Sequence, residues 1–484
     1  MFKRLLALLL LLSLALLAGA VLHTLTLSYE RPEARPPDPL SFDTSTAVER
    51  FAGAIRIPTV SRPEQAPDLA ALKVFHDYLE QQFPAVSAQL RREAVGQGAL
   101  LYTWAGQDPS LPAAVLMGHM DVVPAGDEAA WTQAPFSGAV QDGAIWGRGT
   151  LDDKINVLGI LEAAEALLAE GYKPQRTLLF AFGGDEENGG EYGAKAIAAL
   201  LAQRGVEPLL VLDEGGTLSQ GLVPGVAGAV ALIGTAEKGY ASARLTAHSA
   251  GGHASMPPPE MAIGILSKAL SALQEHPMPA RLTPVSKQMF DAIAPAMSFP
   301  GRVVVTNRWL SAPLLIAMLE GAPSSAAMVR TTTALTMFDA GIKDNVLPDT
   351  ASAVVNFRLL PGDSAETLMT HIHDTIDDER IAVQWLQPPN EASPISPKQG
   401  PAWEILSRSI AQSAPDAVIS PYLMMGASDA THFTGLTPAV YRYSPITLTP
   451  QSLDRIHGVD ERIAVDNYLD AVRFYAQFMR NAGG

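Results

Sequence analysis

Five residues of types that bind metal ions stand in five short motifs, each at the end of an apolar, strand-like run. They are His119, Asp152, Glu187, Asp213 and His457. Two imidazoles and three carboxylates, one of them shared, suit a pair of zinc-like divalent ions. Such a pair with a free carboxylate beside it can activate water. The chemistry that these residues indicate is therefore metal-assisted hydrolysis.

Two groups of acids sharpen this prediction. Asp152 and Asp153 follow a glycine-containing turn, and Asp185, Glu186 and Glu187 follow an apolar run. Buried carboxylates repel one another or take up protons unless cations neutralise them. One of the last two glutamates would bind metal, while its neighbour would move a proton from water to a leaving nitrogen. The alternative explanations are a helix N-cap and a solvated acidic turn.

Asp121 lies two residues after His119. It can accept a hydrogen bond from the ring nitrogen that does not bind metal, which would fix the tautomer and strengthen the ligand. A core histidine beside a turn aspartate is the alternative explanation.

The elements around these motifs predict an α/β fold. Between residues 47 and 239, short apolar runs alternate with helical patterns, which indicates a mostly parallel sheet flanked by helices. Ligands of such sheets gather at the carboxyl ends of the strands, where the motifs fall. Strands are expected at 113–117, 177–182 and 209–212, and helices at 156–169 and 192–203.

A second pattern begins near residue 241. Apart from a long segment between 276 and 329, it reads β-α-β-β-α-β, an antiparallel, ferredoxin-like sheet with helices on one face. Because His457 lies beyond it, we expect an inserted lid or dimerisation domain at 241–390 that splits a catalytic domain into 45–240 and 391–484. Its elements are expected at 241–247, 260–274, 331–337, 351–359, 365–376 and 381–386, with a further helix at 402–414.

The first 25 residues predict export. Lys3 and Arg4 precede an apolar run that reaches Leu22, a length between a signal peptide and a membrane span. Positive residues before such a run favour translocation of the chain on its carboxyl-terminal side. We expect a membrane anchor with an extracytoplasmic catalytic domain, or a secreted or periplasmic protein if the segment is cleaved. The proline-rich residues 26–44 predict a stalk.

Composition excludes some functions. Net charge is −16 and no basic stripe occurs, so nucleic acid is not an expected partner. The chain has no cysteine, which excludes disulfides, thiolate zinc sites and a cysteine nucleophile.

Taken together, the motifs resemble the co-catalytic zinc metallopeptidases that include aminoacylase, carnosinase, glutamate carboxypeptidase and carboxypeptidase S. The resemblance covers about residues 45–480, with the motifs in family order, and is greatest to the carboxypeptidase S branch, which also contains secreted N-acyl amino acid hydrolases. It rests on His-x-Asp at 119–121, Gly-Arg-Gly-x-x-Asp-Asp-Lys at 147–154, Glu-Glu at 186–187, Asp-Glu-Gly-Gly at 213–216 and the histidine at 457.

The resemblance implies a role for each metal-site residue. His119 and Asp213 would hold one zinc, Glu187 and His457 the other, and Asp152 would bridge them; other divalent transition metals are possible. Glu186 would be the general base and Asp121 the partner of His119. A cis peptide bond is implied between Asp152 and Asp153.

Five further positions match the family's substrate side. His253 resembles a histidine lent across a homodimer to stabilise the oxyanion. Asn345 and Arg358 resemble residues that grip a substrate carboxylate, which Arg can bind with two hydrogen bonds. Gly426 and Ser428 lie in a motif that resembles a substrate-side loop, although Ala430 and Thr431 stand where relatives often have an arginine. Without the resemblance, the first three would be a turn histidine, a turn asparagine and a surface ion pair.

The predicted function is a zinc-dependent metallopeptidase or amidohydrolase that cleaves the amide bond next to a C-terminal amino acid. Its substrate would be a short peptide with a free carboxylate; the alternative is an N-acyl amino acid, whose acyl group the apolar segment 312–319 is a candidate to accommodate. An inactive binding or scaffold protein is the alternative of another class.

Overall fold

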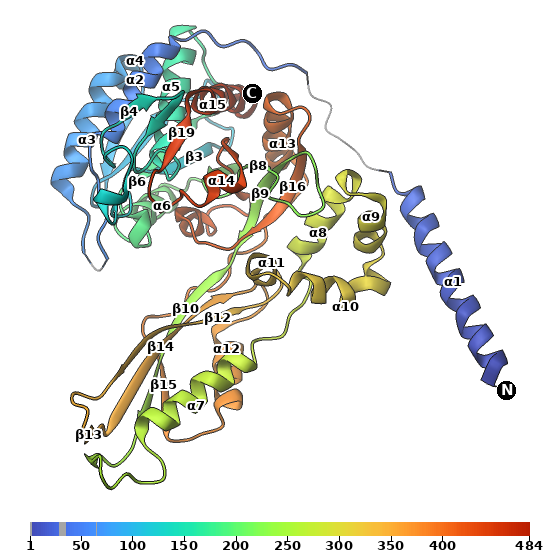
Figure 1. The fold of residues 1–484 in the computed structure, drawn as a ribbon. Helices are drawn as coiled ribbons and strands as arrows, with labels where there is room; N and C mark the ends of the chain where they lie inside the picture. The colour runs from blue at the N-terminus through green and yellow to red at the C-terminus, as the bar shows by residue number, and fades with distance from the viewer. Residues whose placement is uncertain (1, 29–34, 64) are drawn as a thin grey trace.

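The computed structural model describes residues 2–28, 35–63 and 65–484, and its largest feature is a ten-stranded sheet (Figure 1). Its strands are β1 (Arg91–Val95), β2 (Ala99–Trp104), β3 (Ala114–His119), β6 (Leu178–Gly183), β7 (Leu210–Asp213), β8 (Leu218–Gln220), β9 (Ala229–Glu237), β16 (Val418–Met424), β17 (Val440–Arg442) and β18 (Thr447–Leu448). Their order is β1-β2-β6-β3-β7-β17-β9-β8-β18, and β16 pairs with β9. The central strands β6, β3, β7 and β17 run parallel, so their carboxyl ends share one edge.

Helices cover both faces of this sheet. Within β3, Leu116 packs against the helices of one face, whereas Val115 and Met117 pack against the other. This alternation follows from the two-residue period of a strand. The first face carries α2 (Thr44–Ile55), α3 (Leu69–Gln82), α4 (Pro84–Gln89), α5 (Lys154–Ala169), α13 (Pro401–Ser413) and α15 (Val465–Gly483); the second carries α6 (Ala194–Gln203) and the 3-10 turn η4 (Asp429–Phe433).

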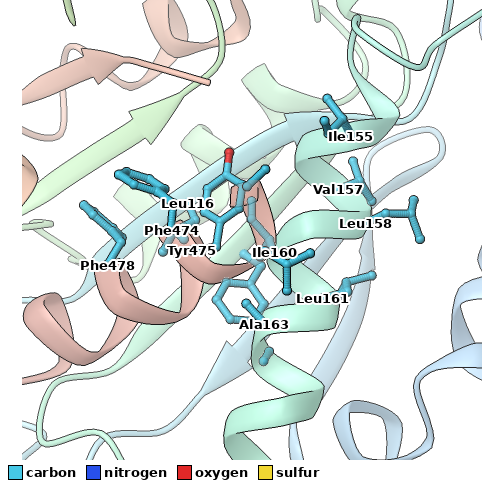
Figure 2. Close-up of a cluster of buried hydrophobic side chains, with 14 of the residues drawn as sticks. Leu116, Ile155, Val157, Leu158, Ile160, Leu161, Ala163, Phe474, Tyr475 and Phe478 are labelled. Carbon is cyan, nitrogen blue, oxygen red and sulfur yellow. The ribbon is translucent and has the colours of Figure 1, made fainter. Parts of the chain in front are cut away.

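Helix α5 is buried along almost its whole length. Figure 2 shows Ile160 of α5 and Phe474 and Tyr475 of α15 in the cluster that contains Leu116 of β3. Because α5 is enclosed between the sheet and α15, the acids just before its first residue are held at the carboxyl edge of the sheet.

A smaller antiparallel sheet extends away from the large one (Figure 1). Along the chain, the element order is β-α-β-β-α-β, as the sequence pattern predicts, and the strand order is β12-β14-β10-β15. Helices α7 and α12 pack on one face of the sheet. The bounds are β10 (Gly239–His248), α7 (Ala262–Glu275), β12 (Thr332–Ala340), β14 (Thr350–Leu359), α12 (Ala365–Ile376) and β15 (Ile381–Trp385), with a short ribbon of β11 (Gly252–His253) and β13 (Val346–Leu347).

The long segment between α7 and β12 is helical and belongs to the other sheet. It forms α8 (Pro284–Ile293), η3 (Ala294–Ala296), α9 (Phe299–Thr306), α10 (Arg308–Leu319) and α11 (Pro323–Ala327). Met289 and Phe290 of α8 pack with Val230 of β9 and Tyr422 of β16. These helices therefore extend the part of the molecule that contains the large sheet.

A three-stranded sheet joins the end of the chain to its first half. It consists of β4 (Ala139–Gln141), β5 (Ala144–Trp146) and β19 (Arg462–Ala464), in the order β19-β5-β4. The 3-10 turn η1 (Glu128–Ala130) precedes β4, and the short helix α14 (Pro450–Leu453) lies before β19. This pairing fixes the loop that carries His457.

The N-terminal helix α1 (Phe2–Thr26) is long and apolar enough to cross a membrane by length and composition, and it lies beside α9 (Figure 1). Residues 29–34 of the predicted stalk lie outside the described residues. A later part of the stalk packs against α15: the Asp38 N–H donates to Gln477, and Arg480 donates to the Pro39 carbonyl.

Candidate metal centre

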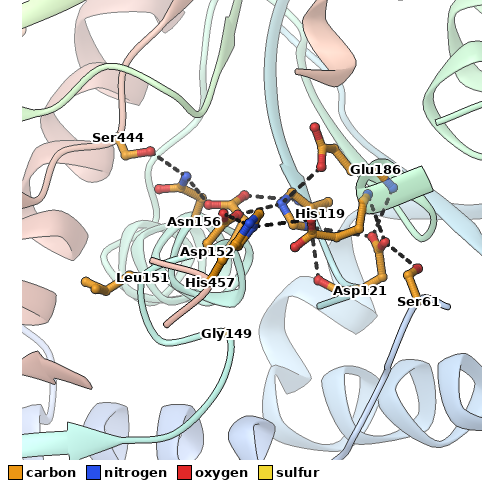
Figure 3. A network of polar contacts seen from close by, with 12 residues as sticks. Ser61, His119, Asp121, Gly149, Leu151, Asp152, Asn156, Glu186, Ser444 and His457 are labelled. Atoms are coloured by element: carbon orange, nitrogen blue, oxygen red, sulfur yellow. Dashed lines mark hydrogen bonds and ion pairs between the residues drawn. The ribbon is translucent and has the colours of Figure 1, made fainter. Parts of the chain in front are cut away.

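The carboxylate of Asp152 lies between two histidines from widely separated parts of the chain (Figure 3). The distance from His119 Nε2 to Asp152 Oδ1 is 2.9 Å, and that from His457 Nε2 to Asp152 Oδ2 is 3.0 Å. His119 is the last residue of β3, and Asp152 stands just before α5. Each oxygen of one carboxylate therefore faces a different imidazole, as a bridging ligand would.

Glu186 and Glu187 enter the site from the 3-10 turn η2 (Glu186–Asn188), which follows β6. Glu187 Oε2 lies 3.4 Å from His457 Nε2, and Glu186 Oε2 lies 3.9 Å from His119 Nε2. Glu187 thus stands among the ligand-type residues, and Glu186 is beside them.

The donor geometry fits a cation. His119 Nδ1 lies 3.0 Å from the backbone carbonyl of Asp121, which can only accept, so Nδ1 carries the proton and Nε2 presents a lone pair. That lone pair faces a carboxylate oxygen, and two electron-pair donors at this distance need a proton or a metal ion between them. Tetrahedral bonds of about 2.0–2.1 Å place neighbouring ligand atoms about 3.3 Å apart, close to the observed separations.

A tight group of ligand atoms forms the core of this site. Atoms of His119, Asp152 and Glu187 lie within 4.8 Å of one another. The second oxygen of Glu187, Oε1, is buried and accepts no hydrogen bond from the described residues. A buried acceptor without a donor is unfavourable, which again favours a bound cation.

Asp213 ends β7, the strand beside β3. Its Oδ2 accepts a hydrogen bond of 2.7 Å from the Ala430 N–H, and burial raises its pKa to about 6. It stands outside the tight group of His119, Asp152 and Glu187.

The acids around the centre are poorly solvated. Burial raises the pKa of the Glu186 carboxyl well above its usual range, and it does the same for Asp429. Both oxygens of Asp429 are buried and have no hydrogen-bond partner among the described residues. Conversely, the carboxylates of Asp152 and Glu187 raise the pKa of His457 to about 10. Such a concentration of buried acids is stable only with protons or cations among them.

Asp121 connects His119 to the turn that carries the two glutamates. Its Oδ1 accepts the Glu186 N–H at 3.1 Å, and its Oδ2 accepts the Glu187 N–H at 3.2 Å and the Ser61 hydroxyl at 2.6 Å. Oδ1 lies 3.4 Å from His119 Nδ1. Asp121 therefore positions both the histidine and the η2 turn.

Glu461 contacts the centre, although the sequence alone predicts no role for it. It is fully buried, and its Oε1 accepts the N–H groups of Leu151 at 2.7 Å and Asp152 at 3.3 Å. Its Oε2 pairs with Arg148 at 2.6 Å, and this arginine also donates to the His457 carbonyl. The signal for this contact in the sequence is an acidic residue directly before a strand, four residues after His457.

Asp153, the neighbour of Asp152, also holds the site together. The peptide bond between Asp152 and Asp153 is cis, as the family resemblance implied. Asp153 Oδ2 accepts the His119 N–H at 3.0 Å, and its Oδ1 accepts from Asn156, which also donates to Ser444.

A cleft of about 960 Å³ opens beside the centre and is lined by Asp152, Glu186, Glu187 and His457. Gly426 and Arg358 also line it, and the Arg358 guanidinium stacks 4.8 Å from the ring centre of Tyr240. Ser428 does not line the cleft. It is buried and donates to Glu237, which forms an ion pair with Arg442.

The apolar part of the cleft comes from elements other than the expected one. Side chains of α8 and of the segment from α11 to Met328 line it together with β9 and β16. No residue of 312–319 lines the cleft, because the inner face of α10 packs into the helical cluster and its other face points outward. The expectation that this segment contributes an acyl pocket is therefore wrong.

His253 and Asn345 lie at the far end of the small sheet. His253 is in the ribbon of β11 and β13, and the carbonyl of Asn345 accepts the Ala254 N–H. Figure 1 shows β13 at the end of the small sheet farthest from the large sheet. Both residues are exposed, and neither lines the cleft within one chain.

Fold and site together define a class. A mostly parallel sheet that is flanked by helices and gathers imidazoles and carboxylates at its carboxyl edge, with a neighbouring glutamate, is the architecture of a metal-dependent hydrolase. The family model for "Peptidase family M20/M25/M40" matches residues 115–481, and the chain belongs to this family.

Known relatives and solved structures agree with this assignment. The chain is 40% identical over 482 residues to the Xenopus tropicalis N-fatty-acyl-amino acid synthase/hydrolase PM20D1, covering 99% of this chain and 94% of the relative. It is 38% identical over 482 residues to the Dictyostelium discoideum "Probable carboxypeptidase S-like 2", covering 97% and 92%. Its fold resembles the M20 family metallo-carboxypeptidase Sso-CP2 from Sulfolobus solfataricus, with a TM-score of 0.67 at 16% identity, covering 90% of this chain and 99% of that one.

Proposed function

We propose that this hydrolase cleaves the amide bond next to a C-terminal amino acid and releases that amino acid. The observation that carries the proposal is the carboxylate of Asp152, which faces His119 and His457, with Glu186 beside it at the cleft.

Two divalent ions, with zinc the first choice, would be held at this centre. His119 and Asp213 would hold one ion, Glu187 and His457 the other, and Asp152 both. Bound ions would lower the pKa of water and polarise the scissile carbonyl.

The chain's own residues would do the rest. Glu186 takes a proton from the attacking water and passes it to the leaving nitrogen, while the new C–O bond forms and the C–N bond breaks. Its buried position, which raises its pKa, suits a group that must hold and then release a proton. Arg358, at the cleft wall, pairs with the substrate carboxylate.

His253 and Asn345 can take part in this reaction only if part of the chain moves or if two copies of the chain assemble. Closure of the small sheet, or a second copy of the chain, would bring them to the substrate. His253 would then stabilise the oxyanion, and Asn345 would help Arg358 hold the carboxylate.

The cleft favours one substrate type. Its apolar arm contains Leu232, Met289, Met328, Tyr422 and Met424. Apolar walls of this extent suit a long acyl chain better than the polar backbone of a peptide. An N-fatty-acyl amino acid is therefore our preferred substrate, as the name of the Xenopus relative suggests, with short peptides second.

Metal analysis and a substrate panel test the function together. We expect about two divalent ions per chain, loss of amide cleavage on chelation, and recovery on adding zinc. The panel pairs N-fatty-acyl amino acids with dipeptides of the same C-terminal residue, and amidated versions test the need for a carboxylate. Absence of cleavage of every member by metal-loaded protein would reject the proposal in favour of a binding or scaffold role.

The N-terminal helix supports an exported protein. Lys3 and Arg4 before an apolar helix favour a catalytic half outside the cytoplasm, with α1 as anchor or as a cleaved signal peptide.

A further inference from the structure

Helix α10 presents an apolar face outward. Its exposed residues are separated by alternating intervals of one and three positions, which places them along one side of the helix. Trp309 is 66% exposed, Leu314 58% and Met318 63%. The full stripe is Trp309, Leu310, Pro313, Leu314, Ala317 and Met318.

The opposite side of α10 is already packed. Leu315 is 5% exposed and belongs to the cluster of α8 and β9. A surface helix of a soluble domain carries charged or polar residues on its outer face, whereas none of the six stripe residues is polar. A contiguous exposed apolar patch marks a surface that something else covers.

The neighbouring element suggests what covers it. Asn307, at the corner between α9 and α10, donates from Nδ2 to the Ala20 carbonyl at 3.1 Å and to Thr24 Oγ1 at 2.9 Å. Its Oδ1 lies 3.0 Å from Nδ1 of His23. Asn307 is 2% exposed, so this contact is closed to water. The last turns of α1 are thus tied to the start of α10.

Helix α1 determines how deep in a lipid bilayer that contact would lie. It is long and apolar enough to span a membrane, and its basic residues Lys3 and Arg4 are at the end away from the contact. With those residues on the cytoplasmic side, Ala20 to Thr24 reach the outer leaflet. The α10 stripe begins at Trp309, two residues after Asn307, so its first residues lie at the same depth.

We propose that the α10 stripe docks into the outer leaflet of a lipid bilayer beside α1. Insertion is apolar rather than electrostatic, because the net charge of −16 gives the chain no general attraction to anionic lipid. Trp309 suits the headgroup boundary, where tryptophan is enriched.

Docking would bring the cleft close to the membrane. The helices on either side of the α9–α10 pair, α8 and α11, supply Met289 and Ser324 to the cleft wall. A substrate with a fatty-acyl chain would then enter from the leaflet. This consequence rests on the proposed function, whereas the docking does not.

The absence of cysteine from the chain makes a clean test possible. The full chain is reconstituted in phosphatidylcholine bilayers with one spin-labelled cysteine at a time, Leu314→Cys or Met318→Cys. Leu11→Cys in α1 is the lipid-exposed reference, and Ile342→Cys, at a position 95% exposed on the small-sheet side, is the water-exposed reference. Collision rates with oxygen and with a water-soluble paramagnetic chelate report depth.

We expect the Leu314 and Met318 labels to lose most collisions with the chelate and to gain collisions with oxygen, as at Leu11. Adding Leu310→Ser and Leu314→Ser should return the Met318 label to water, with an unchanged midpoint of thermal unfolding. Rates equal to those at Ile342 would overturn the proposal. Protection from both agents, with broadening between labels, would overturn it in favour of a second copy of the chain. Amidase activity is not part of this readout, so failure of the proposed function is separate.

Discussion

At the scale of single residues, the centre depends on Asp152, because each of its oxygens faces a different histidine. Glu461 accepts the N–H of Asp152, and Arg148 ties Glu461 to the His457 carbonyl. The buried ion pair between Arg148 and Glu461 therefore holds two of the predicted ligands, Asp152 and His457, in position.

Replacing Glu186 separates proton transfer from metal binding. Glu186→Gln removes the base without changing its shape, and we expect turnover to fall by about 100- to 10,000-fold. Metal content should stay near that of the parent. Glu128→Gln, an exposed glutamate, is the control. Unchanged turnover in the Glu186 variant would favour a binding or scaffold role.

Replacing Glu461 tests how the centre is held. In Glu461→Gln the carboxylate that accepts the Leu151 and Asp152 N–H groups becomes an amide and Arg148 loses its ion pair. We expect metal affinity to fall by about 10- to 100-fold, as for other residues that orient ligands. Competition with a chelator measures this, and Asp460→Asn is the neighbouring control. Affinity equal to that of the parent would show that Glu461 does not position Asp152.

At the scale of elements, Lys238 marks the junction of the two sheets. It connects β9 to β10, and its Nζ donates to the carbonyls of Ala327 at 3.0 Å and Arg330 at 2.9 Å. Burial, assisted by the nearby Arg358, lowers its pKa from 10.5 to about 7.

This shift predicts a pH dependence of stability. Between pH 7 and 10.5 the unfolded chain keeps a proton that folded Lys238 has released, so the free energy of unfolding should rise with pH. Lys238→Met should lack this rise. Thermal unfolding of parent and variant across that range measures it, with Lys268→Met as the exposed-lysine control. If the curves of unfolding free energy against pH stay parallel for parent and variant, they would contradict the lowered pKa of Lys238.

At the scale of the whole molecule, the predicted substrate residues divide into two groups. Arg358 lies at the cleft, whereas His253 and Asn345 stand at the far end of the small sheet. If His253 and Asn345 act on the substrate as proposed, a large closure or a second subunit must bring them to the cleft.

Mixing two inactive variants distinguishes these routes. If a partner supplies His253, heterodimers of Glu186→Ala and His253→Ala contain one complete site. Random mixing should then restore roughly a quarter of the parent's sites. Activity that recovers on mixing, with mixing of two Glu186→Ala preparations as control, supports the dimer. No recovery, with subunit exchange verified, would favour closure within one chain.

The sequence by itself determined the local architecture. Apolar runs predicted β3, β6 and β7 to within a few residues. Of the residues predicted to bind metal, the structure brings ligand atoms of His119, Asp152 and Glu187 within 4.8 Å of one another. The β-α-β-β-α-β order was also predictable, because strand and helix periods are visible within each segment.

Only the tertiary structure decided the contacts between distant segments. Glu461 meets Leu151 across 310 positions because β19 pairs with β5, and no local pattern encodes that pairing. The helices of 276–329 attach to the large sheet through the side chains they bury there, and α10 turns its apolar stripe outward. Periodicity shows that a face is apolar, but only packing determines what covers it.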